Sequence, residues 1–389
     1  MIILEAPYVS EFLQQSVIDL KIPVLKNEFV QTLKLANQMN LIEPTDFFDK
    51  IKNAEYPVLY SNSENSTVLL NQYIPESAIT NRINFFKDKS KLRSLFKNSK
   101  SNIWYKSYNY NQLFEIAIET MQKPFVIKPL RGFASICIHS VFNNNDWQFV
   151  LSEIKKEIEL MHNVFPDNVV SLQEFIIEQY VEGKEIAIDA YFNNNNEPVI
   201  LNILHHLHNA PNDMSDRLYI TSAEIVTGYY DGVYNYLLEL SELMSLKNFP
   251  FHMEMILDKE GKYIPVEINP MRFMGFCVAD VENYFYGINP YEYYFNQKKP
   301  DWNEILKTRK NIIYGMVGID IPKHLNKNTI NFNYDKFISY FTNPIHYTKM
   351  DYKKFPMAIY LYAQVDKTNF KEFEHILFSD LQEFIDEIQ

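Results

Sequence analysis

Short apolar runs alternate with amphipathic stretches along the first hundred residues of the chain. The runs at 2–4, 22–25 and 57–60 are typical of short strands, and residues 9–20 have the spacing of a helix. This alternation predicts a small open α/β sheet. No G-x-G-x-x-G pattern follows the first run, which argues against a dinucleotide-binding site of the common kind.

The pattern changes near residue 102. Apolar positions at helical spacing from Trp147 to Ile158, and again from Val233 to Met244, predict two amphipathic helices. Strands are predicted at 124–128, 174–179, 185–192 and 198–204, and a hairpin at 251–257 and 263–268. The last ninety residues carry no motif that we can assign, although they are rich in aromatic side chains and are expected to fold.

Composition narrows the class of protein. The 389 residues suffice for two to three domain-sized units, and 47% apolar with 22% charged residues is ordinary for a globular protein. The net charge of −12, without a long run of Lys and Arg, argues against nucleic acid as the main partner. With only 9 glycines, the chain has little material for a glycine-rich phosphate loop.

No feature of the sequence indicates secretion or a membrane. The two cysteines, Cys137 and Cys277, lie in unlike contexts and do not suggest a disulfide framework. The first residues lack a basic segment followed by a long apolar stretch, so we expect no signal peptide. No apolar window reaches the roughly 18 residues of a membrane span, and we expect a cytoplasmic protein.

The predicted hairpin brings two carboxylates together. Side chains two apart on a strand share a face, so Glu267 and Asn269 point the same way. Counting back through the turn places Glu254 almost directly across from Glu267. Opposed carboxylates repel unless a cation lies between them, and two carboxylates with an amide oxygen suit Mg²⁺. On spacing alone, an amphipathic hairpin with a polar outer face explains the pattern equally well.

Together these segments resemble the ATP-grasp superfamily, of the carboxylate–amine (amino-acid) ligase type. The run from Glu267 to Pro270 is similar to that family's E-x-N-P metal signature, with Glu254 at the upstream acidic ligand. Residues 124–129 resemble the strand whose lysine contacts ATP phosphates, 178–185 the hinge that holds adenine and ribose, and 88–93 an earlier lysine segment. The resemblance covers roughly residues 2–290 and rests on the order of the motifs in combination.

The resemblance implies an α/β (α+β) architecture with the ATP-grasp fold. It divides the chain into an N-terminal open α/β pre-ATP-grasp domain at 1–100, a small lobe at 101–184, a large lobe with the metal hairpin at 185–300, and a C-terminal extension at 301–389. ATP and Mg²⁺ are the implied cofactors, with Mn²⁺ as an alternative metal.

The resemblance also implies roles for residues that bind the nucleotide. Lys128 and Lys89 would contact the phosphates, unless they are solvated surface lysines. The backbone carbonyl of Gln179 and the N–H of Val181 would bind adenine. Glu178 would lie near the adenine amino group and Glu185 would accept from the ribose hydroxyls; both could instead be ordinary carboxylates at strand ends. These four residues, with Lys89 and Lys128, form the main part of the expected nucleotide site.

Four further residues are expected near the phosphates and the substrate. Ser135 belongs to a loop that would cover the β- and γ-phosphates, although this loop has fewer glycines than most relatives. A bulky Phe133 in that loop can exclude water from a reactive intermediate. Arg272 would bind a substrate carboxylate or acyl phosphate, but it stands one position later than in the usual motif. Arg217 is a weaker candidate for a further cation at the γ-phosphate.

The favoured function is a ligase in which Arg272 and Lys128 serve catalysis on small carboxylate and amine substrates, such as amino acids or a peptide. A homodimer is compatible with the sequence. The alternatives are a phosphotransferase to a hydroxyl group and a nucleotide-binding module without activity.

His205, His206 and His208 do not suggest a zinc site, because three such close histidines do not easily share one tetrahedral ion without a carboxylate or cysteine nearby. They are interpreted as lining the substrate side of the following loop, or as surface residues.

Overall fold

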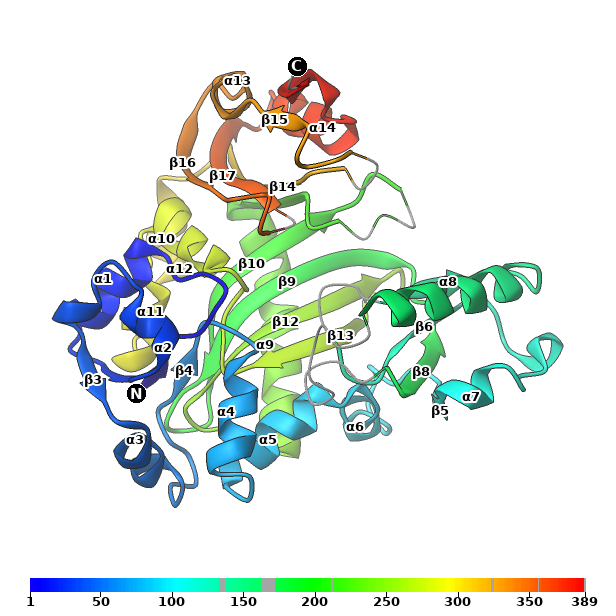
Figure 1. Cartoon of the computed structure of the whole chain (residues 1–389), viewed down its shortest axis with the longest axis horizontal. Coiled ribbons are helices and arrows are strands. Elements are labelled where there is room, and N and C mark those ends of the chain that lie inside the picture. Colours follow the sequence, from blue (N-terminus) through cyan, green and yellow to red (C-terminus); the bar gives the residue numbers. More distant parts are fainter. Residues whose placement is uncertain are drawn as a thin grey trace.

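The computed structural model describes residues 1–132, 137–161, 172–210, 213, 215–322, 325–355 and 357–387. Within these ranges the strands form one sheet of eight strands, two of four and one of two. The eight-stranded sheet lies at the centre, with one four-stranded sheet at the N-terminal side and the other projecting on the opposite side (Figure 1). No helix among the described residues has the length and apolar character needed to cross a membrane.

The N-terminal sheet is parallel and has the order β3-β2-β1-β4. Its strands are β1 (Ile2–Ile3), β2 (Pro23–Leu25), β3 (Asn40–Ile42) and β4 (Tyr60–Ser61). The helices that connect and follow them are α1 (Glu11–Asp19), α2 (Glu28–Gln31), α3 (Pro44–Ile51), α4 (Ser66–Tyr73), α5 (Ala78–Lys87) and α6 (Lys89–Leu95). The open α/β sheet predicted from the alternating apolar runs is therefore confirmed.

The second four-stranded sheet, here called the small sheet, is antiparallel with the order β5-β8-β6-β7. It consists of β5 (Tyr105–Asn109), β6 (Phe125–Pro129), β7 (His139–Val141) and β8 (Glu174–Gln179), with α7 (Tyr110–Leu113) beside it. Helix α8 (Asp146–Met161) covers one face, because Trp147, Val150 and Ile154 recur on one side of the helix and are buried in the same apolar cluster as Phe125 and Ile127.

The large sheet has the order β13-β12-β9-β10-β11-β14-β17-β16, and its neighbours are antiparallel. Its strands are β9 (Gly183–Phe192), β10 (Pro198–Leu207), β11 (Leu218–Ser222), β12 (Phe249–Asp258), β13 (Tyr263–Pro270), β14 (Ile312–Asp320), β16 (Pro344–Lys349) and β17 (Met357–Asp366). The predicted strands and hairpin between residues 185 and 268 all fall on members of this sheet.

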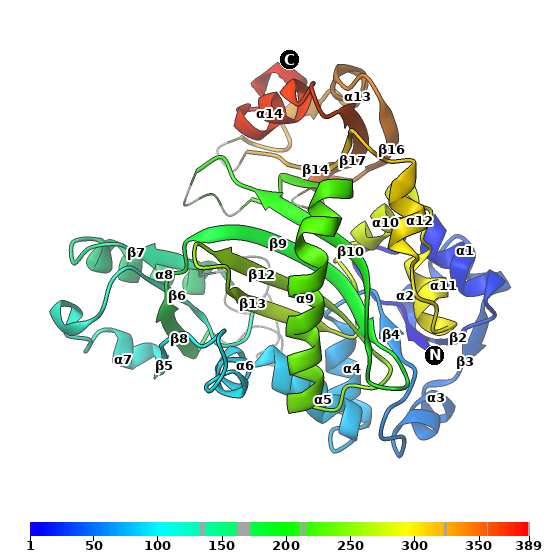
Figure 2. The same cartoon turned by 180° about the vertical axis from the view of Figure 1, so that it is seen from behind.

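Helices pack against the large sheet. Helix α9 (Ala223–Leu243) runs along the back of the sheet (Figure 2) and buries Val233, Leu237 and Leu240 in one cluster with Ile188 and Met253. The remaining elements are α10 (Val281–Tyr286), α11 (Pro290–Phe295), α12 (Trp302–Lys307), α13 (Tyr334–Tyr340), α14 (Lys371–Phe378) and the strand pair β15 (Ile330–Phe332) and β18 (Ile385–Glu387).

The last third of the chain is continuous with the sheet that precedes it. Strands β14, β17 and β16 extend the large sheet beyond β11, although the predicted division at 300/301 would separate them from it. The predicted division at 184/185 falls inside β9. The four-part division remains a prediction. Both Cys137 and Cys277 are buried free thiols, as the sequence led us to expect.

Candidate active site

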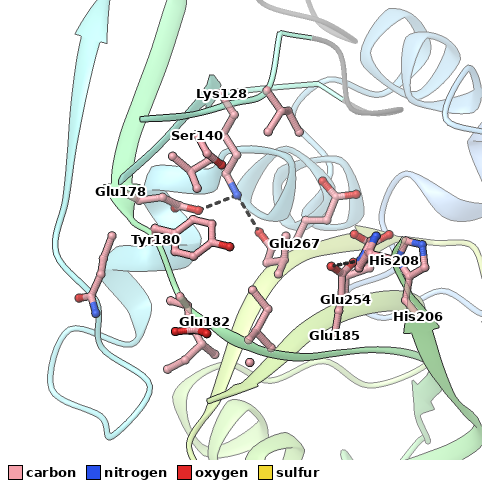
Figure 3. Close-up of a pocket in the computed structure, with 18 of the residues that line it drawn as sticks. Lys128, Ser140, Glu178, Tyr180, Glu182, Glu185, His206, His208, Glu254 and Glu267 are labelled. Atoms are coloured by element: carbon pink, nitrogen blue, oxygen red, sulfur yellow. Dashed lines mark hydrogen bonds and ion pairs between the residues drawn. The ribbon is translucent and has the colours of Figure 1, made fainter. Parts of the chain in front are cut away.

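A cavity of about 1030 Å³ lies between the small sheet and the large sheet. It is lined by β6 and β8 of the small sheet, by residues of β10, β12 and β13 of the large sheet, by helix α6, and by segment 179–185 that joins the two sheets. All four segments that carry the sequence resemblance therefore border one cavity. Figure 3 shows side chains from these elements pointing into it.

One end of the cavity holds a buried carboxylate paired with two cations (Figure 3). Glu178 Oε2 accepts a 2.8 Å hydrogen bond from Arg93 Nε, and Glu178 Oε1 accepts from Arg93 Nη2 at 3.0 Å. Lys128 Nζ lies 2.7 Å from the same Oε1. Burial favours the neutral form of this carboxyl, but the charges of Arg93 and Lys128 prevail and lower its pKa to about 2. We call Arg93, Lys128 and Glu178 the paired end.

The two cations of the paired end also contact the hairpin. Lys128 Nζ donates to the carbonyl of Val266 at 3.4 Å, and Arg93 Nη1 donates to the carbonyl of Pro265. Arg93 reaches this position because α6 begins at Lys89, where Asp88 accepts from the N–H groups of Ser90 and Lys91. Lys89 and Arg93 are four residues apart and so lie on one face of the helix, toward the cavity.

The other end of the cavity holds two carboxylates that face each other. Glu254 on β12 pairs directly with Glu267 on β13, as the count through the turn predicted, and a bulge follows Glu254. Asn269 Nδ2 donates to Glu267 Oε1 at 2.8 Å, and Lys89 Nζ lies 3.4 Å from Glu267 Oε2. We call Glu254, Glu267 and Asn269 the acidic end.

The two facing carboxyls differ in their affinity for a proton. Burial and then the neighbouring charge of Glu267 raise the pKa of Glu254. Burial also opposes ionisation of Glu267, yet Lys89, the Asn269 amide and Lys128 lower its pKa to about 2. Lys89 partly balances the charge of Glu267, and His252 Nε2 lies 3.7 Å from Glu254 Oε1. His252 is also paired with Asp189, at 2.7 Å from Nδ1 to Oδ1, so the pair keeps part of its negative charge.

The acidic end fits a divalent cation of the hard type. Its donors are two carboxylates on adjacent strands and the side-chain amide of Asn269, whose NH₂ group already points to Glu267 and leaves the amide oxygen for a metal. Oxygen donors of this kind suit Mg²⁺, which keeps water or phosphate oxygens in its remaining positions. A divalent ion would also relieve the repulsion between Glu254 and Glu267.

The segment between the sheets presents backbone groups to the cavity. The N–H of Gln179 donates to the carbonyl of Trp104 at 3.0 Å, and that of Tyr180 donates to Pro124 at 3.3 Å. Val181 lines the cavity directly after them. The two bonds fix the chain at the end of β8, so the positions of Gln179 and Val181 are set before a ligand binds.

Comparison with known proteins identifies the domain that contains this cavity. Residues 121–280 match the family described as the ATP-grasp domain. The chain carries an ATP-grasp domain. Lys128, segment 179–185 and the hairpin all lie within the matched residues, whereas Lys89 and Arg93 precede them.

Among characterised proteins, D-alanine–D-alanine ligase of Petrotoga mobilis is 28% identical over 90 residues. This match spans 23% of the present chain and a quarter (25%) of the length of that relative. An L-amino acid ligase from Bacillus licheniformis superposes with a TM-score of 0.71 at 14% identity, covering 100% of this chain and 97% of the other. At this identity the likeness shows a shared fold.

A second similar structure is the biotin carboxylase domain of Hydrogenobacter thermophilus 2-oxoglutarate carboxylase, solved with MgADP, ADP and bicarbonate. Its TM-score is 0.58 at 13% identity, over 94% of this chain and 86% of that chain. The chain thus shares its overall fold with these two structures over almost its whole length. This likeness confirms the α/β architecture expected from the sequence.

Not every predicted residue of the ATP-grasp site lines the cavity. Arg272 lies at the far end of the hairpin, where its Nε donates to Glu64 Oε1 at 2.8 Å and its Nη1 to the carbonyl of Phe273 at 3.0 Å. Lys87 also pairs with Glu64. Among these contacts Nη2 of Arg272 is not used, so that nitrogen can still donate to a ligand.

Arg217 points away from the ATP-grasp cavity. Its Nη1 donates to the carbonyls of Ile376, Leu377 and Ser379, at 3.4, 3.3 and 2.7 Å, at the C-terminal end of α14. A guanidinium suits this place because the last carbonyls of a helix lack partners within the helix. This placement gives no support to the predicted role at the γ-phosphate. Ser135 and Phe133 lie outside the described residues.

Sequence reasoning missed two features of the ATP-grasp site. The role of Arg93 was missed, although its spacing from Lys89 on a capped helix was a usable signal. The contact of Glu185 with His206 and His208 was also missed, because it depends on how β9 pairs with β10. Glu178 is held by Arg93 and Lys128, and its place near the adenine amino group stays a prediction.

Proposed function

We propose that the protein is an ATP- and Mg²⁺-dependent carboxylate–amine ligase. The observation that carries this proposal is the pair of facing carboxylates, Glu254 and Glu267, in the same cavity as Lys128 and Lys89 within an ATP-grasp domain. A cavity that holds two lysines and a pair of facing carboxylates is suited to a polyphosphate together with a divalent ion. The MgADP complex of the similar biotin carboxylase domain supports this choice of ligand.

The nucleotide would lie along the segment between the sheets. The carbonyl of Gln179 and the N–H of Val181 would bind the adenine edge, and Glu185 would accept from the ribose hydroxyls. Lys128 and Lys89 would contact the phosphates, and Ser135 belongs to the loop expected above them. We assign Glu178 to holding Lys128 in place, since its carboxylate lies 2.7 Å from that ammonium group and is buried with it.

The acidic end would hold the metal ion through Glu254, Glu267 and Asn269. A bound Mg²⁺, or Mn²⁺ in its place, neutralises phosphate charge at the point of transfer. Lys89, which now lies 3.4 Å from Glu267, would move its charge to the phosphates when the metal binds. Both lysines act as point charges that can follow the changing phosphate geometry.

The reaction would take place in two steps. A carboxylate oxygen of the first substrate attacks the γ-phosphorus of ATP, the bond from that phosphorus to the bridging oxygen breaks, and ADP leaves. The amine nitrogen of the second substrate then attacks the carbonyl carbon of the acyl phosphate. The C–O bond breaks, phosphate leaves, and the surplus proton of the amine passes to solvent. Lys128 would stabilise the transferring phosphoryl group, and Arg272 would bind the carboxylate through its unused Nη2.

We propose amino acids or a short peptide as the substrates. This choice rests on two similar proteins, a D-alanine–D-alanine ligase and an L-amino acid ligase, and on Arg272, whose planar guanidinium suits a carboxylate. We place the reaction in the cytoplasm, where ATP is abundant.

The proposal is tested by incubating the protein with Mg-ATP and pairs of amino acids, and measuring ADP, free phosphate and products by mass spectrometry. A ligase forms ADP, phosphate and a condensed product in equal amounts, and only when both substrates are present. ADP with a phosphorylated product and no free phosphate would instead identify a phosphotransferase. If the folded protein binds ATP but forms no ADP with every pair tested, the ligase proposal fails.

A further inference from the structure

A carboxylate and two histidines meet on the wall of the cavity beside the acidic end. Glu185 Oε1 lies 3.1 Å from His206 Nδ1, and Glu185 Oε2 lies 3.1 Å from His208 Nε2. One ligand atom from each of the three residues lies within 4.8 Å of the other two. Figure 3 shows the three side chains gathered next to Glu254. The sequence alone shows no carboxylate close to these histidines and therefore argues against a metal there. The structure places the carboxylate of Glu185 beside two of them.

The arrangement follows from the pairing of two strands. β9 and β10 are antiparallel, with His205 opposite Ile186, so the next positions along, His206 and Glu185, also face each other. His206 lies on β10 and His208 lies one residue beyond its end at Leu207, and the centroids of their rings are 4.0 Å apart. The strand register therefore fixes Glu185 and His206, and His208 follows directly after β10.

The hydrogen bonds of His206 require a cation between its ring and Glu185. Its Nε2 lies 3.0 Å from the carbonyl of Ser215, which can only accept, and its Nδ1 lies against the carboxylate. A neutral imidazole has one N–H, which the carbonyl takes. Nδ1 then presents a lone pair to a carboxylate, and this contact is repulsive unless a proton or a metal ion lies between them.

We propose that Glu185, His206 and His208 form a binding site for a divalent transition metal ion, with Zn²⁺ as the best match. Two imidazoles and one carboxylate are a common ligand set for Zn²⁺, and they leave a further position open toward the cavity. The carbonyl of Ser215 would hold His206 in the tautomer that leaves Nδ1 free, as partners of ligating histidines commonly do. His206 is buried, which protects the site from competing water on one side.

This site differs in chemistry from the acidic end, although the two are neighbours. The acidic end offers only oxygen donors and suits Mg²⁺, whereas the Glu185 site offers two imidazole nitrogens, which Mg²⁺ does not favour. The inference goes beyond the proposed function and does not depend on it. Because Glu185 is also the residue proposed for the ribose hydroxyls, the metal titrations should be made without nucleotide.

The test uses the full chain, stripped of metal with a chelator and titrated with Co²⁺ as a visible probe, followed by displacement with Zn²⁺. The variants His206→Gln, His208→Gln and Glu185→Gln each remove one ligand. His205→Gln is the matched control, because this histidine is adjacent on the same strand but is not part of the cluster. Glu254→Gln is the second control, because it removes a carboxylate from the acidic end.

We expect the unaltered protein to bind one Co²⁺ with absorption typical of nitrogen ligands, and its paramagnetic NMR spectrum to show two far-shifted, exchangeable imidazole N–H signals. Each ligand variant should lose at least about 100-fold in affinity, since even changes beside a metal ligand cost 10–100-fold. Both controls should keep the affinity of the unaltered protein. Zn²⁺ should raise the melting temperature of the unaltered protein and of the controls, but not of the ligand variants, which distinguishes lost binding from a lost fold.

Three results would overturn the inference. The first is the absence of Co²⁺ binding to the folded, metal-free protein. The second is binding that persists unchanged in His208→Gln. The third is binding that is lost in Glu254→Gln, which would place the ion at the acidic end. In each of these cases a proton, rather than a metal, bridges His206 and Glu185.

Discussion

The two ends of the cavity balance their charges in opposite ways. At the paired end, both oxygens of Glu178 have a cationic partner, and Arg93 and Lys128 are buried with it. At the acidic end, Glu254 and Glu267 face each other, and Lys89 lies 3.4 Å from only one of them. The same residue types therefore form a cluster with two cations for one carboxylate at one end and an anionic cluster at the other.

This difference indicates what each end contributes. The carboxylate of the paired end already has two cationic partners, so we expect this buried cluster to hold the lobes and to fix Lys128 in position. An anionic cluster lacks a cation, so we expect it to be completed by a ligand. Exchanging the carboxylate of the paired end should therefore affect mainly stability, whereas exchanging a carboxylate of the acidic end should affect mainly metal-dependent turnover.

The largest effect is expected from Glu267→Gln. Loss of one carboxylate removes a metal ligand, and turnover should fall below detection while thermal unfolding and the circular dichroism spectrum stay close to those of the unaltered protein. Glu182→Gln is the matched control, because Glu182 is an exposed carboxylate that lines the same cavity. Near-normal turnover in Glu267→Gln would remove the acidic end from the mechanism.

Lys128→Met should have the next largest effect on activity. Removal of one positive group from the transferring phosphate commonly costs about 100-fold or more in rate, and we expect a loss of that order in kcat/KM. Lys184→Met, which removes an exposed lysine from the same cavity wall, should change kcat/KM by less than about twofold because a surface charge is screened. Equal losses in the two variants would show that Lys128 contributes only general charge.

The main effect of Glu178→Gln should be a loss of stability. The change leaves Arg93 and Lys128 without their buried partner, and breaking such a pair costs about 3 kcal/mol. Because the pKa of Glu178 falls from 4.5 to about 2 on folding, its ionisation stabilises the fold above pH 4.5 and this contribution is lost as the pH falls toward 2. Denaturation at neutral and at acid pH should show the difference between variant and unaltered protein shrinking with acid. A constant difference would contradict the ion-pair account.

The smallest effect is expected from Arg217→Gln. This arginine holds carbonyls at the end of α14 and lies outside both ends of the cavity, so we expect a loss of stability of about 1.5 kcal/mol. Turnover under conditions where the variant is folded should be unchanged. A large fall in kcat with normal stability would instead support the role at the γ-phosphate that the sequence suggested.

The local pattern of apolar and polar residues was sufficient to predict much of the fold. The strands predicted at 174–179 and 251–257 correspond to β8 and β12, because a short apolar run marks β8 and the turn at 258–261 ends β12. The pairing of Glu254 with Glu267 was also predictable, since a short hairpin sets its own register.

Contacts between distant segments could not be predicted in this way. The pairing of Arg93 with Glu178 joins residues 85 positions apart, and no periodicity in either segment encodes it. Arg217 was assigned by analogy with lysines in relatives, but the C-terminal segment that attracts its side chain carries no motif. Glu185 and the histidines depend on the pairing of β9 with β10, which the sequence does not specify alone.

The most direct test of the proposed ligase uses an amino acid whose carboxylate oxygens carry a heavy isotope. Incubation with Mg-ATP and an amine substrate, followed by mass spectrometry of the released phosphate, reports whether a carboxylate oxygen attacked phosphorus. An acyl-phosphate ligase transfers one labelled oxygen from the carboxylate to free phosphate for each amide formed. Amide formation with unlabelled phosphate, or ADP formation with the phosphoryl group retained on a hydroxyl product, would contradict the account.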